Sequence, residues 1–257
     1  MFAAAIVPGV LIGAALGLLG GGGSVLTVPI FVYVLGFAPK EAIAMSLAVV
    51  GATSAFGTAS HWRSGNVNLR VAGAFGGVAM LATLFGVRLA RFVPGTMQLI
   101  IFGAVMLAAA VFMLRGCAPC GEETIAQPAM SALKVVPGAL LIGALTGIVG
   151  VGGGFLIVPA LVLMGMSLRE AVGTSLLIIT GTCVVGVLGY LGHVSLDWAA
   201  VTVVAAGTLP GIALGSYLHQ FVPQAILRRG FAVFLVVMAT FIFLENLGPL
   251  SALSRGH

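Results

Sequence analysis

Two stretches of this sequence, one in each half, decide how the chain is organised. Gly17–Pro29 reads GLLGGGGSVLTVP and Gly147–Pro159 reads GIVGVGGGFLIVP, with identical residues at seven of thirteen positions. Further stretches match in almost the same register, among them Phe92-Val93-Pro94 with Phe221-Val222-Pro223. The chain is therefore an internal duplication, and each copy carries a glycine cluster followed by a proline.

The composition excludes a water-soluble domain. Only 7% of the 257 residues are charged, whereas 60% are hydrophobic and the mean hydropathy is +1.23. Soluble domains carry about 25% charged residues, so this chain lacks the side chains to cover a surface in water. Soluble, disordered and nucleic-acid-binding classes are excluded. The net charge of +5 is then best interpreted as a report on loop orientation in a membrane.

Ten apolar segments follow one another along the chain, five in each copy. They cover residues 3–19, 25–35, 42–60, 71–90, 97–114, 135–149, 155–166, 171–191, 198–218 and 224–244. A spanning helix needs about 20 apolar residues, so the pattern predicts an all-α membrane protein, a polytopic helical bundle. We expect residues 1–115 to form the first repeat, 116–134 a cytoplasmic linker loop, and 135–257 the second repeat.

Each repeat is expected to open with a broken or re-entrant helix pair at its glycine cluster. At 1.5 Å per residue, a helix over residues 25–35 extends about 17 Å, short of the roughly 30 Å hydrocarbon core. Residues 155–166 form an equally short segment in the second repeat. These segments are best explained as half-helices that meet their predecessors at glycine inside the membrane.

Charge counting favours inverted over parallel repeats, because basic residues gather on the cytoplasmic side. If the opening pair returns to its own side, each repeat crosses an odd number of times and the basic residues divide seven against four. The two groups are Arg63, Arg70, Arg115, Lys134, Arg169, Arg228 and Arg229, and Lys40, Arg88, Arg91 and Arg255. With an even number the split is five against six. Inverted repeats with the central loop in the cytoplasm are therefore expected.

Duplicated halves with interrupted helices at matching positions are typical of secondary transporters, whose site lies near the midplane between the repeats. A helix that begins inside the membrane presents unpaired N–H groups and a positive dipole end, which favour an anion. The predicted substrate-binding backbone is Gly20, Gly21, Gly22, Gly23 and Ser24 in one repeat, and Gly150, Gly152, Gly153 and Gly154 in the other. Glycine pairs spaced four apart are instead expected to pack helices, namely Gly13 and Gly17, Gly143 and Gly147, Gly211 and Gly215, and Gly73 and Gly77.

The repeated element resembles the TauE/SafE sulfite exporter family. The resemblance rests on G-x-G-G-G-x-x-x-V-P at Gly150–Pro159 and its variant at Gly20–Pro29, each followed by A-x-G-T-S-L at Ala171–Leu176 or its weaker copy at Ala42–Leu47. It implies a multi-pass permease of the cell inner membrane that moves a small sulfur-containing anion such as sulfite, thiosulfate or an organosulfonate. We expect export by alternating access, with no cofactor, no enzymatic activity and no nucleic-acid partner.

Hydroxyl side chains at matching places extend the predicted site. Ser46 and Ser175 occupy equivalent positions in their repeats, and Thr53 and Thr182 lie seven residues further on the same helix face. Thr174 is added, although Met45 takes its place in the first repeat. These hydroxyls are predicted to donate to substrate oxygens. The alternative is that each hydroxyl bonds the backbone of its own helix, as is common in membrane helices.

Four ionisable residues are candidates for proton coupling or anion attraction. Glu41 and Glu170 stand at helix starts, where a carboxylate also complements the helix dipole. His61 lies at a helix end and titrates near neutral pH. Arg88 is the deepest basic side chain, and its alternative role is to extend to the lipid headgroups.

A competing hypothesis concerns Cys117 and Cys120, which form a C-x-x-C pair in the central loop. Such spacing suits a thiol-disulfide or electron relay, or half of a metal site with a regulatory or metal-binding role for the loop. Against the relay, the second repeat has no matching pair and Cys183 stands alone within a helix. A passive anion channel is a further alternative. The sequence offers no metal-ligand set, and the glycine-bearing faces leave a homodimer open.

Overall fold

A computed structural model describes residues 2–114, 132–219 and 224–253, and every regular element in these ranges is a helix. The first copy contains α1 (Phe2–Leu19), the 3₁₀ segment η1 (Gly20–Leu26), α2 (Thr27–Pro29), the π-helical η2 (Ile30–Val34), α3 (Pro39–Arg63), α4 (Leu69–Ala90) and α5 (Gly95–Leu114). The second contains α6 (Ala132–Val149), α7 (Gly154–Leu163), α8 (Leu168–Tyr190), α9 (Trp198–His219) and α10 (Gln224–Leu253).

Four of these helices are long and apolar enough to cross a bilayer: Pro39–Arg63, Leu69–Ala90, Arg169–Tyr190 and Arg229–Asn246. Large apolar side chains also cover the outside of the bundle. Phe85 is 70% exposed and Leu244 73% exposed, an arrangement that is unfavourable in water and favourable in lipid. The chain is therefore a multi-pass helical membrane protein, as the composition predicted.

The helices pair across the two copies. α1 packs along α9, and α6 packs along α4, while α3 pairs with α8 and α5 with α10. Between the copies α1 corresponds to α6 and α4 to α9, so the α1–α9 pair is equivalent to the α6–α4 pair. The α3–α8 and α5–α10 pairs each join a helix to its own counterpart. Each of these pairs thus combines one helix from each copy, and α3 and α8 are among the central elements of the bundle.

Glycines allow close backbone contact in the α1–α9 and α6–α4 pairs. A Cβ built on Gly13 of α1 would lie 2.2 Å from the Thr208 carbonyl oxygen of α9, and one built on Gly143 of α6 would lie 2.3 Å from the Ala79 carbonyl oxygen of α4. Gly73 and Gly77 are different, because a Cβ there meets no atom of the described chain within 4 Å. The prediction that this last pair packs helices is wrong, since α4 crosses α6 further along, at Gly86.

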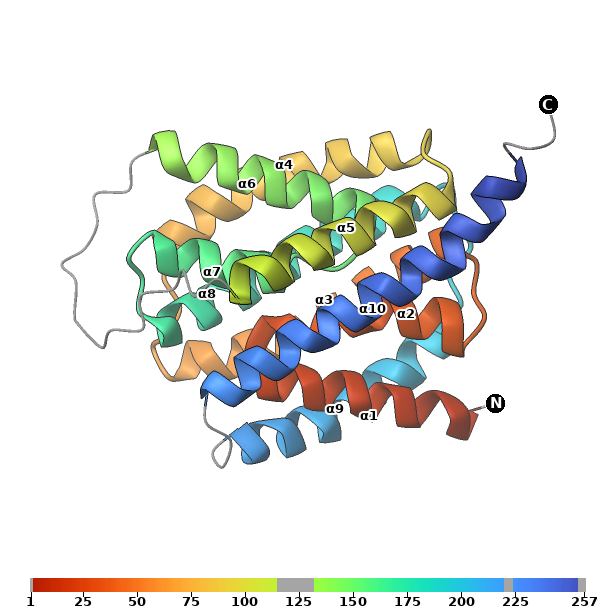
Figure 1. Cartoon of the computed structure of the whole chain (residues 1–257). Helices are drawn as coiled ribbons and strands as arrows, with labels where there is room; N and C mark the ends of the chain where they lie inside the picture. Colours follow the sequence, from red (N-terminus) through yellow and green to blue (C-terminus); the bar gives the residue numbers. More distant parts are fainter. Residues whose placement is uncertain (1, 115–131, 220–223, 254–257) are drawn as a thin grey trace.

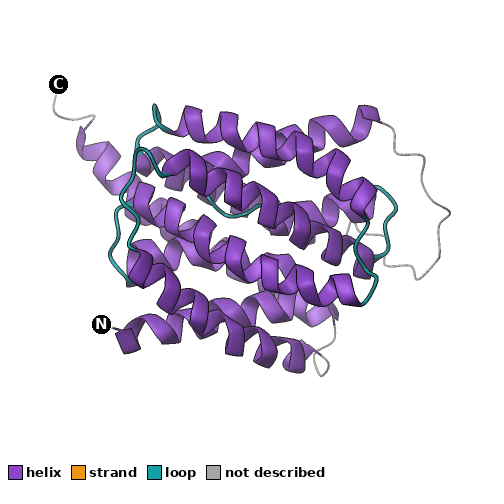
Figure 2. Cartoon of the chain, turned by 180° about the vertical axis from the view of Figure 1, so that it is seen from behind, coloured by secondary structure: helices purple, strands orange, loops and turns teal. Residues whose placement is uncertain are grey.

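The two copies start from opposite ends of the bundle. Figure 1 shows α1 beginning and α10 ending at one end, whereas α5 ends and α6 begins at the other. The view from behind in Figure 2 likewise shows the N- and C-termini at the same end of the bundle. The corresponding helices α1 and α6 therefore begin at opposite ends of the bundle, and α5 and α10 end at opposite ends.

Candidate functional site

The second glycine cluster forms a loop that only glycine fits. α6 ends at Val149 and α7 begins at Gly154, and between them Gly150, Gly152 and Gly153 have φ of +76°, +69° and +70°. L-residues rarely adopt this left-handed conformation. Space is equally short, because a Cβ on Gly150 would lie 2.5 Å from Ile43 Cγ2 and 2.7 Å from the Ile43 carbonyl oxygen. Backbone conformation and packing therefore both require glycine here.

This loop places the N-terminus of α7 inside the protein. Val151, Gly152, Gly153 and Gly154 are all buried. The amides of Leu156 and Ile157 donate to the Gly153 carbonyl oxygen at 3.0 and 2.9 Å, which closes the first turn. The first N–H groups of a helix have no acceptor within that helix, and the helix dipole is positive at this end. The second cluster thus supplies a buried positive pole without a basic side chain.

The first glycine cluster has a different backbone. Gly20–Leu26 continues from α1 as a 3₁₀ helix, with no irregular residues between the two elements. The chain still folds back, because a Cβ on Gly23 would lie 2.2 Å from the backbone nitrogen of Leu16, seven residues earlier. In an uninterrupted α-helix these residues would be about 10 Å apart along the axis. A tight reversal replaces the left-handed loop of the second copy.

The fold brings the two clusters into one region. η1 packs against α7, and both elements pack against α8 in the middle of the bundle. Gly152 lies beside α3 and α8, where a Cβ would be 2.7 Å from Val50 Cγ1 and 3.3 Å from Cys183 Sγ. The predicted glycine residues of both copies are therefore neighbours in space, although they lie in different halves of the sequence.

Ser46 connects the first copy to the glycine loop of the second. Its Oγ lies 2.5 Å from the Gly150 carbonyl oxygen and 2.8 Å from the Ile43 carbonyl oxygen. A hydroxyl has one proton, so it donates to one of these acceptors at a time. Its counterpart Ser175 donates to Val172 of its own helix at 2.8 Å. The matching serines thus have different partners.

The predicted threonines point to different neighbours. Thr53 donates to the Val49 carbonyl oxygen at 2.6 Å, and its Oγ1 lies 3.2 Å from Thr208 Oγ1 of α9. Thr182 donates to the Ile179 carbonyl oxygen of its own helix at 3.1 Å. Ser46 and Thr53 lie on the same face of α3, but Ser46 contacts the glycine loop whereas Thr53 contacts α9. Their shared role at the substrate stays a prediction.

Glu170 and Thr174, at the start of α8, hold the loop before α4. Asn68 Nδ2 donates to Glu170 Oε1 at 2.9 Å, and the backbone N–H of Asn68 donates to Thr174 Oγ1 at 3.0 Å. Asn68 also caps α4, because its Oδ1 accepts from the Val71 amide at 3.2 Å. Gly173 allows this approach, since a Cβ there would lie 2.3 Å from the Asn66 carbonyl oxygen. Both side chains therefore bind the other copy.

Glu41, at the start of α3, has the corresponding partner before α9. Ser195 Oγ donates to Glu41 Oε1 at 2.8 Å, and Asp197 Oδ1 caps α9 by accepting from the amides of Ala199 and Ala200 at 3.0 Å. Sequence reasoning did not single out Asn68 or Ser195. For Asn68 the available signal was a polar residue just before an apolar segment, which is the ordinary pattern of an N-cap. Ser195 gave no such signal, because the residue before α9 is Asp197.

The remaining ionisable candidates lie away from the glycine clusters. Arg88 is exposed near the C-terminal end of α4, and His61 is half-buried in the last turn of α3. Cys117 and Cys120 lie outside the described residues. Cys183 is buried against Gly51 and Gly152. In the part of the chain that the structure describes, no three His, Cys, Asp or Glu side chains are grouped to hold a metal ion.

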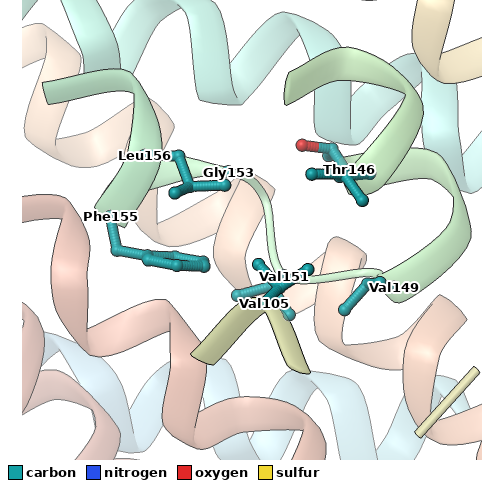
Figure 3. A pocket seen from close by; sticks show the side chains of 8 residues that line it. Val105, Thr146, Val149, Val151, Gly153, Phe155 and Leu156 are labelled. Carbon is teal, nitrogen blue, oxygen red and sulfur yellow. The ribbon is translucent and has the colours of Figure 1, made fainter. Parts of the chain in front are cut away.

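A small cavity adjoins the second glycine loop. Figure 3 shows side chains that line it, from α5 (Val105), α6 (Thr146 and Val149), the loop itself (Val151 and Gly153) and α7 (Phe155 and Leu156). It leaves about 10 Å³ for the centre of a water molecule, which is room for about one water. That volume is too small for a molecule of four or more heavy atoms.

The chain is similar to proteins of known family. The family model described as "Sulfite exporter TauE/SafE" matches residues 5–242. A "Probable membrane transporter protein" of Xylella fastidiosa (strain 9a5c) is 34% identical over 95% of this chain and 95% of its own length. The "Probable membrane transporter protein YdhB" of Bacillus subtilis (strain 168) is 27% identical over 88% of this chain and 92% of its own length. No solved structure matches the chain.

Proposed function

The chain belongs to the sulfite exporter TauE/SafE family and is a membrane transporter, and on this premise we propose that it exports a small sulfur-containing anion. Sulfite, thiosulfate and organosulfonates are the candidate substrates. Residues 5–242 match the family model, so the proposal concerns nearly the whole chain. The site we propose lies between η1 and α7, against α3 and α8.

The observation that carries the proposal is the buried glycine loop in front of α7. Backbone N–H groups and the positive end of the α7 dipole meet there in the protein interior, where Gly152, Gly153 and Gly154 are buried and such charges act strongly on an anion. Among the buried polar residues of the described ranges there is no Lys or Arg. A backbone site of this kind holds an anion loosely enough for release, because it places no full positive charge beside it.

We propose that the two copies are inverted repeats, over residues 1–115 and 135–257, that rock against each other. Opposite directions of corresponding helices support this proposal, as does the exchange of α1–α9 for α6–α4. The Glu170–Asn68 and Glu41–Ser195 hydrogen bonds join the copies at the starts of α8 and α3. If one of these hydrogen bonds breaks while the other is kept, the site would open to one side of the membrane at a time.

Export follows from the energetics of an anion. With the central linker (116–134) in the cytoplasm of an inner-membrane protein, a negative-inside potential drives an anion outward by about 2.3 kcal/mol per charge per 100 mV. The chain has only six Asp and Glu residues, which limits the groups that could couple uptake to protons. Efflux of sulfite from proteoliposomes should therefore speed up when the interior is made negative. An unchanged rate would argue against electrogenic export.

Binding to purified protein in lipid nanodiscs tests the site. We expect calorimetric titration with sulfite, thiosulfate, sulfoacetate and taurine to detect at least one ligand. Gly152→Leu should weaken that binding by more than about tenfold, a loss of at least about 1.4 kcal/mol, because the new side chain meets Val50 and Cys183.

Gly73→Leu is the matched control, since position 73 faces open space. It should bind as the unmodified protein does. Failure of all four compounds to bind would contradict the proposed substrate class. Equal affinity of the Gly152→Leu and Gly73→Leu variants would instead contradict the proposed site.

A further inference from the structure

The hydroxyl of Thr27 differs from eight other buried hydroxyls in the described residues. Thr27 is 0% exposed, and its Oγ1 has no hydrogen-bond partner. Eight other buried hydroxyls in the described helices donate to a carbonyl three or four residues back. They are those of Ser46, Thr53, Thr58, Thr83, Thr146, Ser175, Thr182 and Thr208. Thr27 thus keeps a proton and two lone pairs unused in the protein interior.

An unused buried hydroxyl is unfavourable, because it has lost its hydrogen bonds to water and gained none. One other buried polar atom in the described ranges is in the same state, Oε1 of Gln98. That side chain has a structural role, since its Nε2 donates to the Ala90 carbonyl oxygen at the end of α4 at 2.8 Å. Its free atom is an acceptor only, whereas the Thr27 hydroxyl can donate to an anion.

The position of Thr27 in the fold connects it to the first glycine cluster. It begins α2 directly after η1, four residues beyond Gly23. α2 packs against α3 and η1, and η1 packs against α7. Thr27 is therefore linked to α7 through η1, which packs against both elements.

The duplication provides a comparison for this residue. In the alignment of Gly17–Pro29 with Gly147–Pro159, Thr27 corresponds to Ile157 of α7, which is also 0% exposed. A β-branched apolar side chain therefore fits the equivalent place in the second copy. Packing alone does not require a hydroxyl at position 27, and an apolar residue would avoid the cost of leaving it unpaired.

We infer that the Thr27 hydroxyl donates a hydrogen bond to an oxygen atom of the transported sulfur oxyanion. The inference rests on the proposed function and adds a side chain to a site otherwise made of backbone groups. The first copy then contributes a hydroxyl where the second contributes the start of α7. The site is asymmetric, although the sequence around it is duplicated.

Thr27→Val tests this inference, because valine keeps the shape of threonine and removes the hydroxyl. We expect the affinity for sulfite, measured by calorimetry in nanodiscs, to fall about tenfold, as for loss of a hydrogen bond to a charged group. The melting temperature of the substrate-free protein should stay the same or rise, since an unpaired buried hydroxyl is lost. Thr27→Ser keeps the hydroxyl and should bind sulfite within about twofold of the unmodified protein.

Thr83→Val is the matched control, because Thr83 is buried and its Oγ1 lies within hydrogen-bond distance of the Ala79 and Gly143 carbonyl oxygens, either of which can accept its proton. It should melt at a lower temperature and keep its affinity. Unchanged affinity in Thr27→Val, with binding by the unmodified protein, would overturn the inference and leave the proposed function standing. A lower melting temperature in Thr27→Val without weaker binding would also overturn it. Absence of sulfite, thiosulfate, sulfoacetate and taurine binding by the unmodified protein would overturn both.

Discussion

The two glycine clusters have nearly the same sequence and different structures. In the second copy three glycines take left-handed conformations and form a loop before α7. In the first copy the equivalent residues continue as a 3₁₀ helix that turns back onto α1. Glycine allows either conformation at little cost. The cluster therefore specifies that the helix breaks, and the neighbouring helices decide how it breaks.

The neighbours that differ are identifiable. Ile43 and Ser46 of α3 contact Gly150 in the second loop, and the Ser46 hydroxyl is 2.5 Å from its carbonyl oxygen. The corresponding Ser175 bonds its own helix instead. One loop is therefore held by a contact from the other copy. The first cluster is followed by Thr27, whose buried hydroxyl has no hydrogen-bond partner.

The largest effect should come from an alanine in the left-handed loop. Gly150→Ala combines a strained backbone conformation with contact against the Ile43 backbone, and we expect it to lower the free energy of unfolding by about 3 kcal/mol. Gly65→Ala separates the two causes, because Gly65 has φ +70° and open space around its Cβ. It should cost about 1 kcal/mol. Unfolding in mixed detergent micelles measures both.

Gly20→Ala is the counterpart in the first cluster. In a 3₁₀ helix alanine needs no left-handed backbone, so the loss should be smaller than for Gly150→Ala. Equal losses at positions 20 and 150 would show that the two clusters share one conformation, against the comparison made above.

The loss of unfolding free energy should differ less between alanine variants of the matching serines Ser46 and Ser175. Ser46→Ala removes the hydroxyl next to the buried Gly150 carbonyl oxygen and should cost about 1.5 kcal/mol, because that acceptor is left without this donor. Ser175→Ala removes a bond within one helix and should cost less than about 0.5 kcal/mol. The same unfolding assay applies. If Ser175→Ala proves the more damaging, Ser46 does not fix the loop.

The smallest effects concern the two polar contacts at the starts of α8 and α3. Asn68→Ala removes the α4 cap and the bond to Glu170 and should cost about 1 kcal/mol. Ser195→Ala removes one exposed bond to Glu41 and should cost a few tenths of a kcal/mol. Hydrogen exchange at the first turn of α4 measures the first loss, and hydrogen exchange at the first turn of α3, where Glu41 lies, measures the second. Equal protection losses would mean that the two contacts are equivalent.

Part of the candidate site was predictable, and part was not. The glycine positions and the hydroxyl residues follow from local pattern and duplication. Asn68, Ser195 and the unused Thr27 hydroxyl did not, because their importance depends on partners in the other copy or on the lack of a partner. Gly73 and Gly77 illustrate the converse, since their spacing suits helix packing and they face open space.

The sequence by itself determined that this chain is a membrane protein, that it is an internal duplication, and that a helix is interrupted at glycine in each copy. Hydropathy and repetition are properties of the chain itself and need no partner to be detected. Only the tertiary structure decided which helices pair between the copies, which glycine cluster forms a left-handed loop, and that the Thr27 hydroxyl has no hydrogen-bond partner. These outcomes depend on contacts between distant segments, because a glycine backbone or a hydroxyl takes the conformation or partner that its neighbours leave available.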